Sequence, residues 1–177
     1  DGLDWEPERV LLSYHGIPKR YFMSGDPYHC HCHKTSRLVS EKLGDEVNVE
    51  LTFQSRFGPE EWLQPYTEPR LVELAQSGVR RVAIATPGFA ADCIETLDEI
   101  AIEARHAFEE AGGQHFSFIP CLNDSVGGME SIAAVVRTEL RGWVDAEHRA
   151  PLRVVSDRQS AANESEVDSA QHSASGG

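Results

Sequence analysis

The sequence predicts an α/β fold in which an open parallel sheet carries helices on both faces. Four short apolar runs alternate with helical patterns along the chain, and this alternation is typical of such sheets. The third run contains Val82, Ala83, Ile84 and Ala85 without a polar break, as expected for a strand covered on both faces. A chain of 177 residues is long enough for one domain with a sizeable core.

The individual elements follow from apolar periodicity and from turn residues. The expected strands are residues 10–13, 47–53, 81–86 and 116–119. The expected helices are residues 33–43, 68–77, 92–111 and 128–143. Gly44 ends the first of them, Thr67 caps the start of the second, and Gly112 with Gly113 ends the third. From Asp145 the chain is polar and without a period, so we expect a domain over residues 1–144 and a disordered tail over residues 145–177.

Composition excludes several classes of protein. There are 16 Lys and Arg against 29 Asp and Glu, a net charge of −13, which argues against binding to a nucleic-acid backbone. No apolar run approaches the roughly 18–20 residues of a membrane span. The four cysteines are too few for a disulfide scaffold and no signal peptide is in view, so we expect a reducing, cytoplasmic compartment. The chain starts at Asp1, which fits a mature or truncated product.

Ligands of open parallel sheets bind at the carboxyl ends of the strands. His15 follows the first strand at that edge, and imidazole accepts protons near neutral pH and ligates borderline metals. A loop histidine bonded to backbone is the alternative. Aromatic residues also fall in loops at the strand ends and suggest a flat apolar ligand: Phe57, Trp62, Tyr66 and Phe89. No phosphate-cradling glycine motif follows any strand, which weakens a nucleotide-binding interpretation.

The helix over residues 92–111 shows two contrasting faces. Its apolar stripe consists of Ile94, Leu97, Ala101, Ala104, Phe108 and Ala111. Its opposite face carries only carboxylates, namely Asp92, Glu95, Glu99 and Glu103. Like charges at i,i+4 destabilise a helix, so this row suits the passage of cations or protons, and a solvated face of an acidic protein is the alternative.

The run His29-Cys30-His31-Cys32-His33 has the composition of a metal site. Its spacing departs from zinc sites, whose ligands come in two separated pairs, and Cys93 and Cys121 supply no second pair. If the run opens a helix, only His29 and His33 share a face. A structural metal site and a plain helical surface both stay open.

Several separated motifs, in order, resemble the ferrochelatase family. They are Ser13-Tyr-His-Gly-Ile-Pro18, Gly25-Asp-Pro-Tyr28, Thr52-Phe-Gln-Ser-Arg-Phe-Gly-Pro59 with Trp62, Leu63 and Pro65-Tyr-Thr67, Pro87-Gly-Phe-Ala-Ala-Asp-Cys-Ile-Glu-Thr-Leu97 with Glu99 and Ile100, and Pro120 to Asn123. The resemblance runs from Val10 to Trp143 and is strongest to the bacterial, protoporphyrin-using branch. It covers the C-terminal half of the family, one of two similar lobes, so an N-terminal lobe is an implied partner.

The resemblance implies roles for particular residues. The family's active-site histidine matches His15 and its metal-handling glutamate matches Glu95, so both are expected catalytic and metal-binding residues. Glu99 matches the next carboxylate of the family's acidic helix and is the third expected metal ligand. The positions that line the macrocycle pocket match Trp62 and Phe89, with Gln54 and Ser55 in a nearby loop. The tail contains no cysteine, so we expect no [2Fe–2S] cluster.

The implied function is an enzyme, a lyase that inserts Fe²⁺, its substrate, into protoporphyrin IX to make protoheme in the last step of heme biosynthesis. The resemblance also implies a cytoplasmic protein that can contact the periphery of the inner membrane. Two alternatives stay open: a non-catalytic tetrapyrrole-binding module, and a chelatase for another metal or tetrapyrrole, since Irving–Williams affinities alone do not exclude cobalt or nickel. The sequence leaves open the oligomeric state, the choice between protoporphyrin and coproporphyrin, and the division of proton and metal roles between His15 and Glu95.

Overall fold

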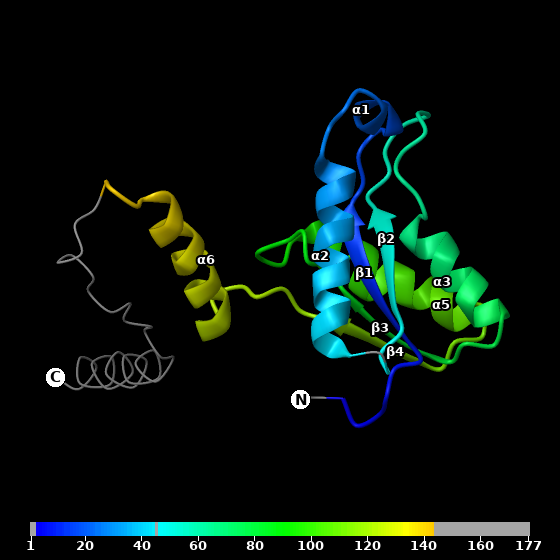
Figure 1. Ribbon diagram of the computed structural model, residues 1–177. Helices are drawn as coiled ribbons and strands as arrows, with labels where there is room; N and C mark the ends of the chain where they lie inside the picture. The colour runs from blue at the N-terminus through cyan, green and yellow to red at the C-terminus, as the bar shows by residue number, and fades with distance from the viewer. Residues whose placement is uncertain (1–2, 45, 144–177) are drawn as a thin grey trace, which may run out of the picture. The chain divides into compact units, whose positions relative to one another are not determined.

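A four-stranded parallel sheet forms the centre of the fold (Figure 1). The computed structural model describes residues 3–44 and 46–143. The strands are β1 (Arg9–His15), β2 (Val49–Gln54), β3 (Arg81–Ala85) and β4 (His115–Ile119), in the order β2-β1-β3-β4. All three pairings are parallel, so the α/β fold class predicted from the sequence is confirmed.

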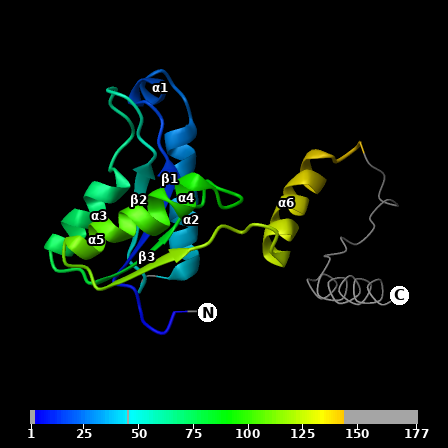
Figure 2. The ribbon, with the colours of Figure 1, turned by 180° about the vertical axis from the view of Figure 1, so that it is seen from behind.

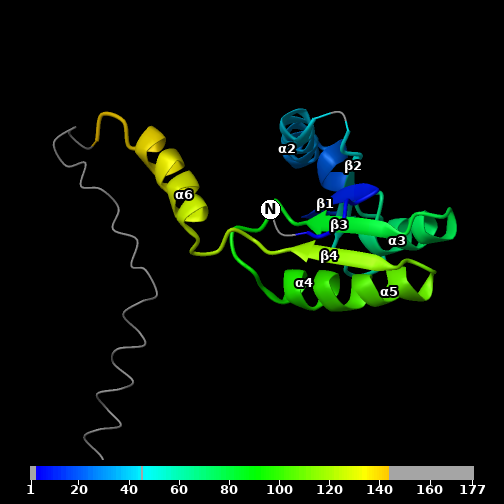
Figure 3. The ribbon, with the colours of Figure 1, turned by 90° about the horizontal axis from the view of Figure 1, so that it is seen from below.

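Helices cover both faces of this sheet, as Figures 1 and 3 show. On one face lies α2 (Tyr28–Leu43), preceded by the short α1 (Lys19–Met23). On the other face lie α3 (Thr67–Gln76) and α5 (Arg105–Glu110), seen from behind in Figure 2. Because side chains of a strand alternate between faces, Leu11 packs in the core beneath α3 and α5, whereas Leu12 packs in the core beneath α2.

The helix predicted over residues 92–111 is divided into three parts. It consists of α4 (Ile94–Leu97), a π-helical turn η1 (Glu99–Ala104) and α5. The wider π turn changes the angle between successive side chains, so the face buried against the sheet differs from the predicted stripe. The buried residues of this segment are Thr96, Ile100, Ala104 and Phe108. Two members of the predicted stripe, Ile94 and Leu97, are instead 71% and 50% exposed.

Several predicted boundaries need correction. The helix expected over residues 33–43 begins at Tyr28, directly after Pro27, and α1 was not predicted. The predicted capping residue Thr67 is the first residue of α3, and its hydroxyl donates to Thr52 instead of capping the helix. The last predicted helix, 128–143, is α6 (Val126–Glu139).

The chain divides by its internal contacts into two units, Asp1–Met129 and Glu130–Gly177. The sheet and its covering helices belong to the first unit, while α6 starts in the first and continues into the second. The proposed tail over residues 145–177 lies outside the described residues. None of the described helices is long and apolar enough to cross a membrane.

Candidate active site

His15 is the last residue of β1 and stands at the carboxyl edge of the sheet. Its Nδ1 lies 2.7 Å from the carbonyl oxygen of Gly16. Because a carbonyl oxygen only accepts hydrogen bonds, Nδ1 carries the proton and Nε2 keeps its lone pair in the neutral ring. The backbone carbonyl of His15 accepts a 2.8 Å hydrogen bond from the Tyr28 hydroxyl, which ties this strand end to the start of α2. Nε2 is therefore the nitrogen through which the neutral ring can accept a proton or ligate a metal.

Two aromatic rings flank the imidazole of His15. The ring centroids of Trp62 and Phe89 lie 6.2 Å and 6.3 Å from it. Backbone hydrogen bonds from Lys19 to Glu61 and from Leu63 to Ile17 lay the segment that carries Trp62 alongside the chain after β1. These four anchoring residues place the indole next to His15.

Two backbone features complete this arrangement. A hydrogen bond from Phe89 to Thr86 closes the turn after β3 that carries the phenyl ring. A side chain at Gly16 would approach the Gln54 carbonyl and Trp62 to 3.0 Å and 3.1 Å, so this close packing requires glycine. The structure thus brings together His15, Trp62 and Phe89, which the sequence placed in separate loops.

Glu99 and Ser55 join the acidic helix to the end of β2. The Ser55 hydroxyl donates to the Glu99 carboxylate over 2.6 Å, and the Ser55 backbone N–H donates to its other oxygen. Ser55 adopts a φ of 62°, a left-handed conformation that costs energy for a residue with a side chain. The carboxylate interaction compensates for this cost and fixes Glu99 at the strand end.

Gln54 lies beneath this edge and is 3% exposed. Its side-chain amide donates to the backbone carbonyl of Glu95 over 2.6 Å, while its oxygen accepts from the Ser13 hydroxyl over 2.8 Å. The Ser13 hydroxyl in turn lies 2.7 Å from that of Thr67. This buried polar chain connects β1, β2 and α3 to α4, so Gln54 positions the backbone that carries Glu95.

Glu95 lies within electrostatic range of His15. Its pKa is lowered, chiefly because the Cys93 thiol hydrogen-bonds to the carboxylate and next because of a backbone hydrogen bond, with a smaller contribution from His15 when its imidazole carries a second proton. An ionised Glu95 next to an imidazole can hold a divalent cation or accept a proton.

Asp92, also in the predicted carboxylate row, has a structural environment. The Asn123 amide donates to one of its oxygens over 2.8 Å, and the Cys121 backbone N–H and the Thr96 hydroxyl donate to the other. Burial tends to raise the pKa of Asp92, but these hydrogen bonds outweigh it and the pKa is lowered. The carboxylate therefore joins the loops after β3 and β4. The sequence flagged Asp92 and Asn123 separately, and nothing in their spacing indicated that they bond.

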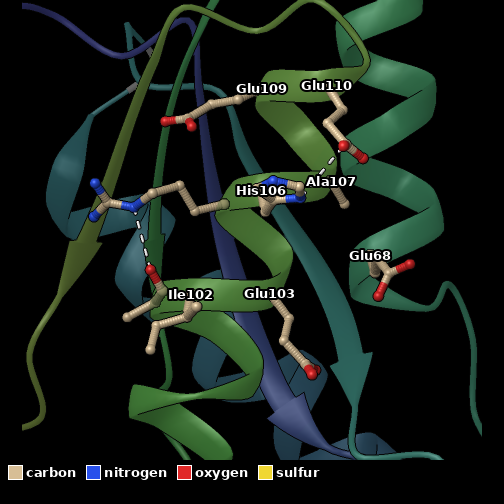
Figure 4. A pocket seen from close by; sticks show the side chains of 9 residues that line it. Glu68, Ile102, Glu103, His106, Ala107, Glu109 and Glu110 are labelled. Carbon is tan, nitrogen blue, oxygen red and sulfur yellow. Dashed lines mark hydrogen bonds and ion pairs between the residues drawn. The ribbon is translucent and has the colours of Figure 1, made fainter.

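Glu103 lies on a different surface from Glu99. It lines a surface hollow of about 770 Å³ over η1 and α5, together with Glu68, His106 and Glu110 (Figure 4). Within this hollow His106 and Glu110 form an ion pair of 3.6 Å when the imidazole is protonated. The predicted row of four carboxylates is thus spread over different surroundings, although Glu99 and Glu103 both belong to the π turn.

The run of histidines and cysteines opens α2, and its members face different directions. Cys32 is 3% exposed and packs in the core with Tyr14, and burial raises the pKa of its thiol. Cys30 is exposed, whereas His29 and His33 lie one turn apart. Among residues 3–44 and 46–143, no group of three or more His, Cys, Asp or Glu side chains is arranged to hold a metal ion. The five residues therefore do not form one structural metal centre.

The family model of ferrochelatase matches residues 3–140, which include every residue of this site. The chain belongs to the ferrochelatase family. The ferrochelatase of Allorhizobium ampelinum is 62% identical over 143 residues, which cover 80% of this chain and 42% of that protein. The ferrochelatase of Agrobacterium fabrum is 59% identical with the same coverage. This ferrochelatase-family chain therefore spans less than half the length of the curated relatives it matches.

A solved structure shows the same fold at low sequence identity. The cobalamin biosynthesis CbiX protein of Marinobacter aquaeolei superposes with a TM-score of 0.54 and 16% identity, covering 77% of this chain and 97% of that one. This likeness agrees with the α/β arrangement of the ferrochelatase-family chain, and at this identity it concerns the fold alone.

Proposed function

We propose that the protein carrying this chain inserts ferrous iron into protoporphyrin IX, with this chain as its C-terminal lobe. The observation that supports this most strongly is the imidazole of His15, with Nε2 available, close to the rings of both Trp62 and Phe89. Flat aromatic side chains suit contact with a flat macrocycle. A base next to those side chains is then also close to the macrocycle.

The reaction needs a base and a site for the metal. Protoporphyrin loses the protons of its two pyrrole N–H groups as Fe²⁺ binds the four ring nitrogens. Glu95 and His15 ligate the incoming Fe²⁺ before it enters the ring, and Glu99 is the next carboxylate toward solvent. When the metal moves to the ring nitrogens, it leaves His15 Nε2, which then accepts one pyrrole proton, while the second pyrrole proton passes to water. The hydrogen bond from Nδ1 to Gly16 orients the imidazole for this transfer.

The side chains around this edge suit an apolar substrate. Phe57, Ile94 and Leu97 are 84%, 71% and 50% exposed. Exposed apolar side chains near a site are candidates for contact with a ligand or another domain. Trp62 and Phe89 hold one side of the macrocycle, and an N-terminal lobe supplies the opposite wall. We place the reaction in the cytoplasm at the periphery of the inner membrane, where an apolar porphyrin partitions.

An anaerobic insertion assay tests this function. The two-lobed protein is given protoporphyrin IX with Fe²⁺, and in parallel with Co²⁺ or Ni²⁺, and the metalloporphyrin is followed by its absorbance. We expect protoheme to form with Fe²⁺. Bound but unchanged protoporphyrin with every metal would contradict the proposal and favour a tetrapyrrole-binding module. Turnover with Co²⁺ or Ni²⁺ but not Fe²⁺ would contradict the choice of metal.

A further inference from the structure

Two histidines of α2 face each other at the distance expected for a chelating pair. His29 and His33 are separated by four residues and so lie one above the other on the helix. Their Nε2 atoms are 3.1 Å apart and their ring centroids 4.3 Å apart. The two Nε2 atoms are thus close enough for one metal ion to reach both.

This separation matches the geometry of metal–imidazole bonds. Bonds of about 2.05 Å from one metal ion to two nitrogens that are 3.1 Å apart enclose an angle of about 98°. That angle lies between the octahedral and tetrahedral values, so one ion can bind both nitrogens without movement of the helix.

The surroundings favour this arrangement. His29 is partly buried, and its ring packs against Phe22 and Phe53 with centroid distances of 4.5 Å and 6.1 Å, so one ligand is held in place before binding. His33 is exposed and borders a surface hollow of about 550 Å³ that leaves room for water ligands.

Two cationic side chains border the pair, and the charge of one of them is offset. Lys34 and Arg37 border the same hollow, and Glu41 offsets the charge of Arg37 through a 3.0 Å ion pair. The net charge of −13 over the whole chain favours the approach of cations.

We propose that His29 and His33 chelate one divalent first-row transition-metal ion at the surface of α2, with water in its remaining positions. In the neutral pair one Nε2–H donates to the other Nε2. On binding, the donor ring moves its proton from Nε2 to Nδ1, so both nitrogens offer lone pairs and no electron transfer is involved. Imidazole suits Cu²⁺, Ni²⁺ and Zn²⁺, and these bind more tightly than Fe²⁺. The site is separate from that of the proposed reaction and does not depend on it.

Metal titration of matched variants tests the site. The full chain is titrated calorimetrically with Ni²⁺ and, as a control for a hard cation, with Mg²⁺. H33Q removes the exposed ligand, while H31Q removes a neighbouring exposed histidine that lies roughly 200° around the helix from His29. Far-UV circular dichroism checks that both variants fold. All other histidines and cysteines are identical in the two proteins.

We expect the wild type and H31Q each to bind one Ni²⁺ ion. The Ni²⁺ affinity of H33Q at this site should be lower by roughly tenfold or more. Ni²⁺ should also raise the melting temperature of the wild type and H31Q more than that of H33Q, because ligands that bind only the folded state stabilise it. Mg²⁺ should not fill the site. Equal Ni²⁺ affinities for H31Q and H33Q, or a site that Mg²⁺ fills equally well, would overturn the proposal. Both readouts are independent of iron insertion.

Discussion

A single hydrogen bond determines which nitrogen of His15 is reactive. The carbonyl oxygen of Gly16, 2.7 Å from Nδ1, accepts the Nδ1–H hydrogen bond, and the ring therefore presents Nε2. The strand position of His15 and its value as a base were predictable from the sequence. The tautomer was not, since it depends on where the adjacent carbonyl points. Likewise, the buried bonds of Gln54 to Ser13 and to the Glu95 backbone join residues 41 positions apart, and no local pattern reveals them.

At the residue scale, Asp92→Asn should destabilise the fold in a pH-dependent way. The folded-state pKa of Asp92 is lowered, so its stabilisation is fully present above the ordinary carboxyl pKa and is lost as the pH falls through the lowered value. We expect a loss of about 1 kcal/mol at pH 7, because an amide cannot accept from Asn123 and Cys121 as a carboxylate does. Urea unfolding from pH 7 to pH 3 measures it.

The difference between wild type and Asp92→Asn should shrink below about pH 4. Glu109→Gln, which changes an exposed carboxylate of α5, serves as the control and should show a smaller effect. A difference that stays constant from pH 7 to pH 3 would show that the loss does not come from the ionised carboxylate.

At the scale of elements, the strands were the most predictable part of the molecule. Each predicted strand overlaps an observed one, because continuous apolar runs are fixed by burial on both faces. The acidic helix was less predictable, because the spacing of its apolar residues does not indicate a π turn. Its effect is visible in Leu97, predicted to be buried and found 50% exposed, and in Thr96, which is fully buried.

The division of this helix predicts unequal roles for its carboxylates. Glu95→Gln should reduce iron insertion by the two-lobed protein roughly 10²-fold, because Glu95 lies within electrostatic range of His15. Glu103→Gln should stay close to wild type, because Glu103 lines the hollow with Glu68 on another surface. Steady-state rates under anaerobic conditions measure both. Equal losses would mean that the carboxylates act as one continuous path across the π turn.

In the turn between α5 and β4, a methyl group added at Gly113 should destabilise the fold. A side chain at Gly113 would overlap the ring of Phe108, which is fully buried. We expect Gly113→Ala to lower the free energy of unfolding by about 1–3 kcal/mol, the usual range for overpacking. Gly88→Ala is the matched control, since its new carbon meets Tyr14 at an ordinary 3.5 Å. Equal urea midpoints for the two variants would show that Phe108 moves without cost.

At the scale of the whole molecule, the chain covers 42% of the length of its relative from Allorhizobium ampelinum. The sheet has helices on both faces and two buried clusters, so we expect the chain to fold alone. It should nevertheless show little iron insertion, because it provides one wall for a large flat ligand and leaves His15 open to water. Circular dichroism and the insertion assay measure the two properties. Turnover equal to that of a two-lobed relative would contradict the requirement for a second wall.

The central claim is that the strand end of this chain supplies the base for iron insertion, and His15→Ala tests it most directly. In the two-lobed protein we expect iron insertion to fall roughly 10²–10⁴-fold, the usual contribution of a general base. The melting temperature should change little, since the imidazole is only partly buried, and His106→Ala on α5 should insert iron at the wild-type rate. Wild-type turnover by a folded His15→Ala protein would contradict the account.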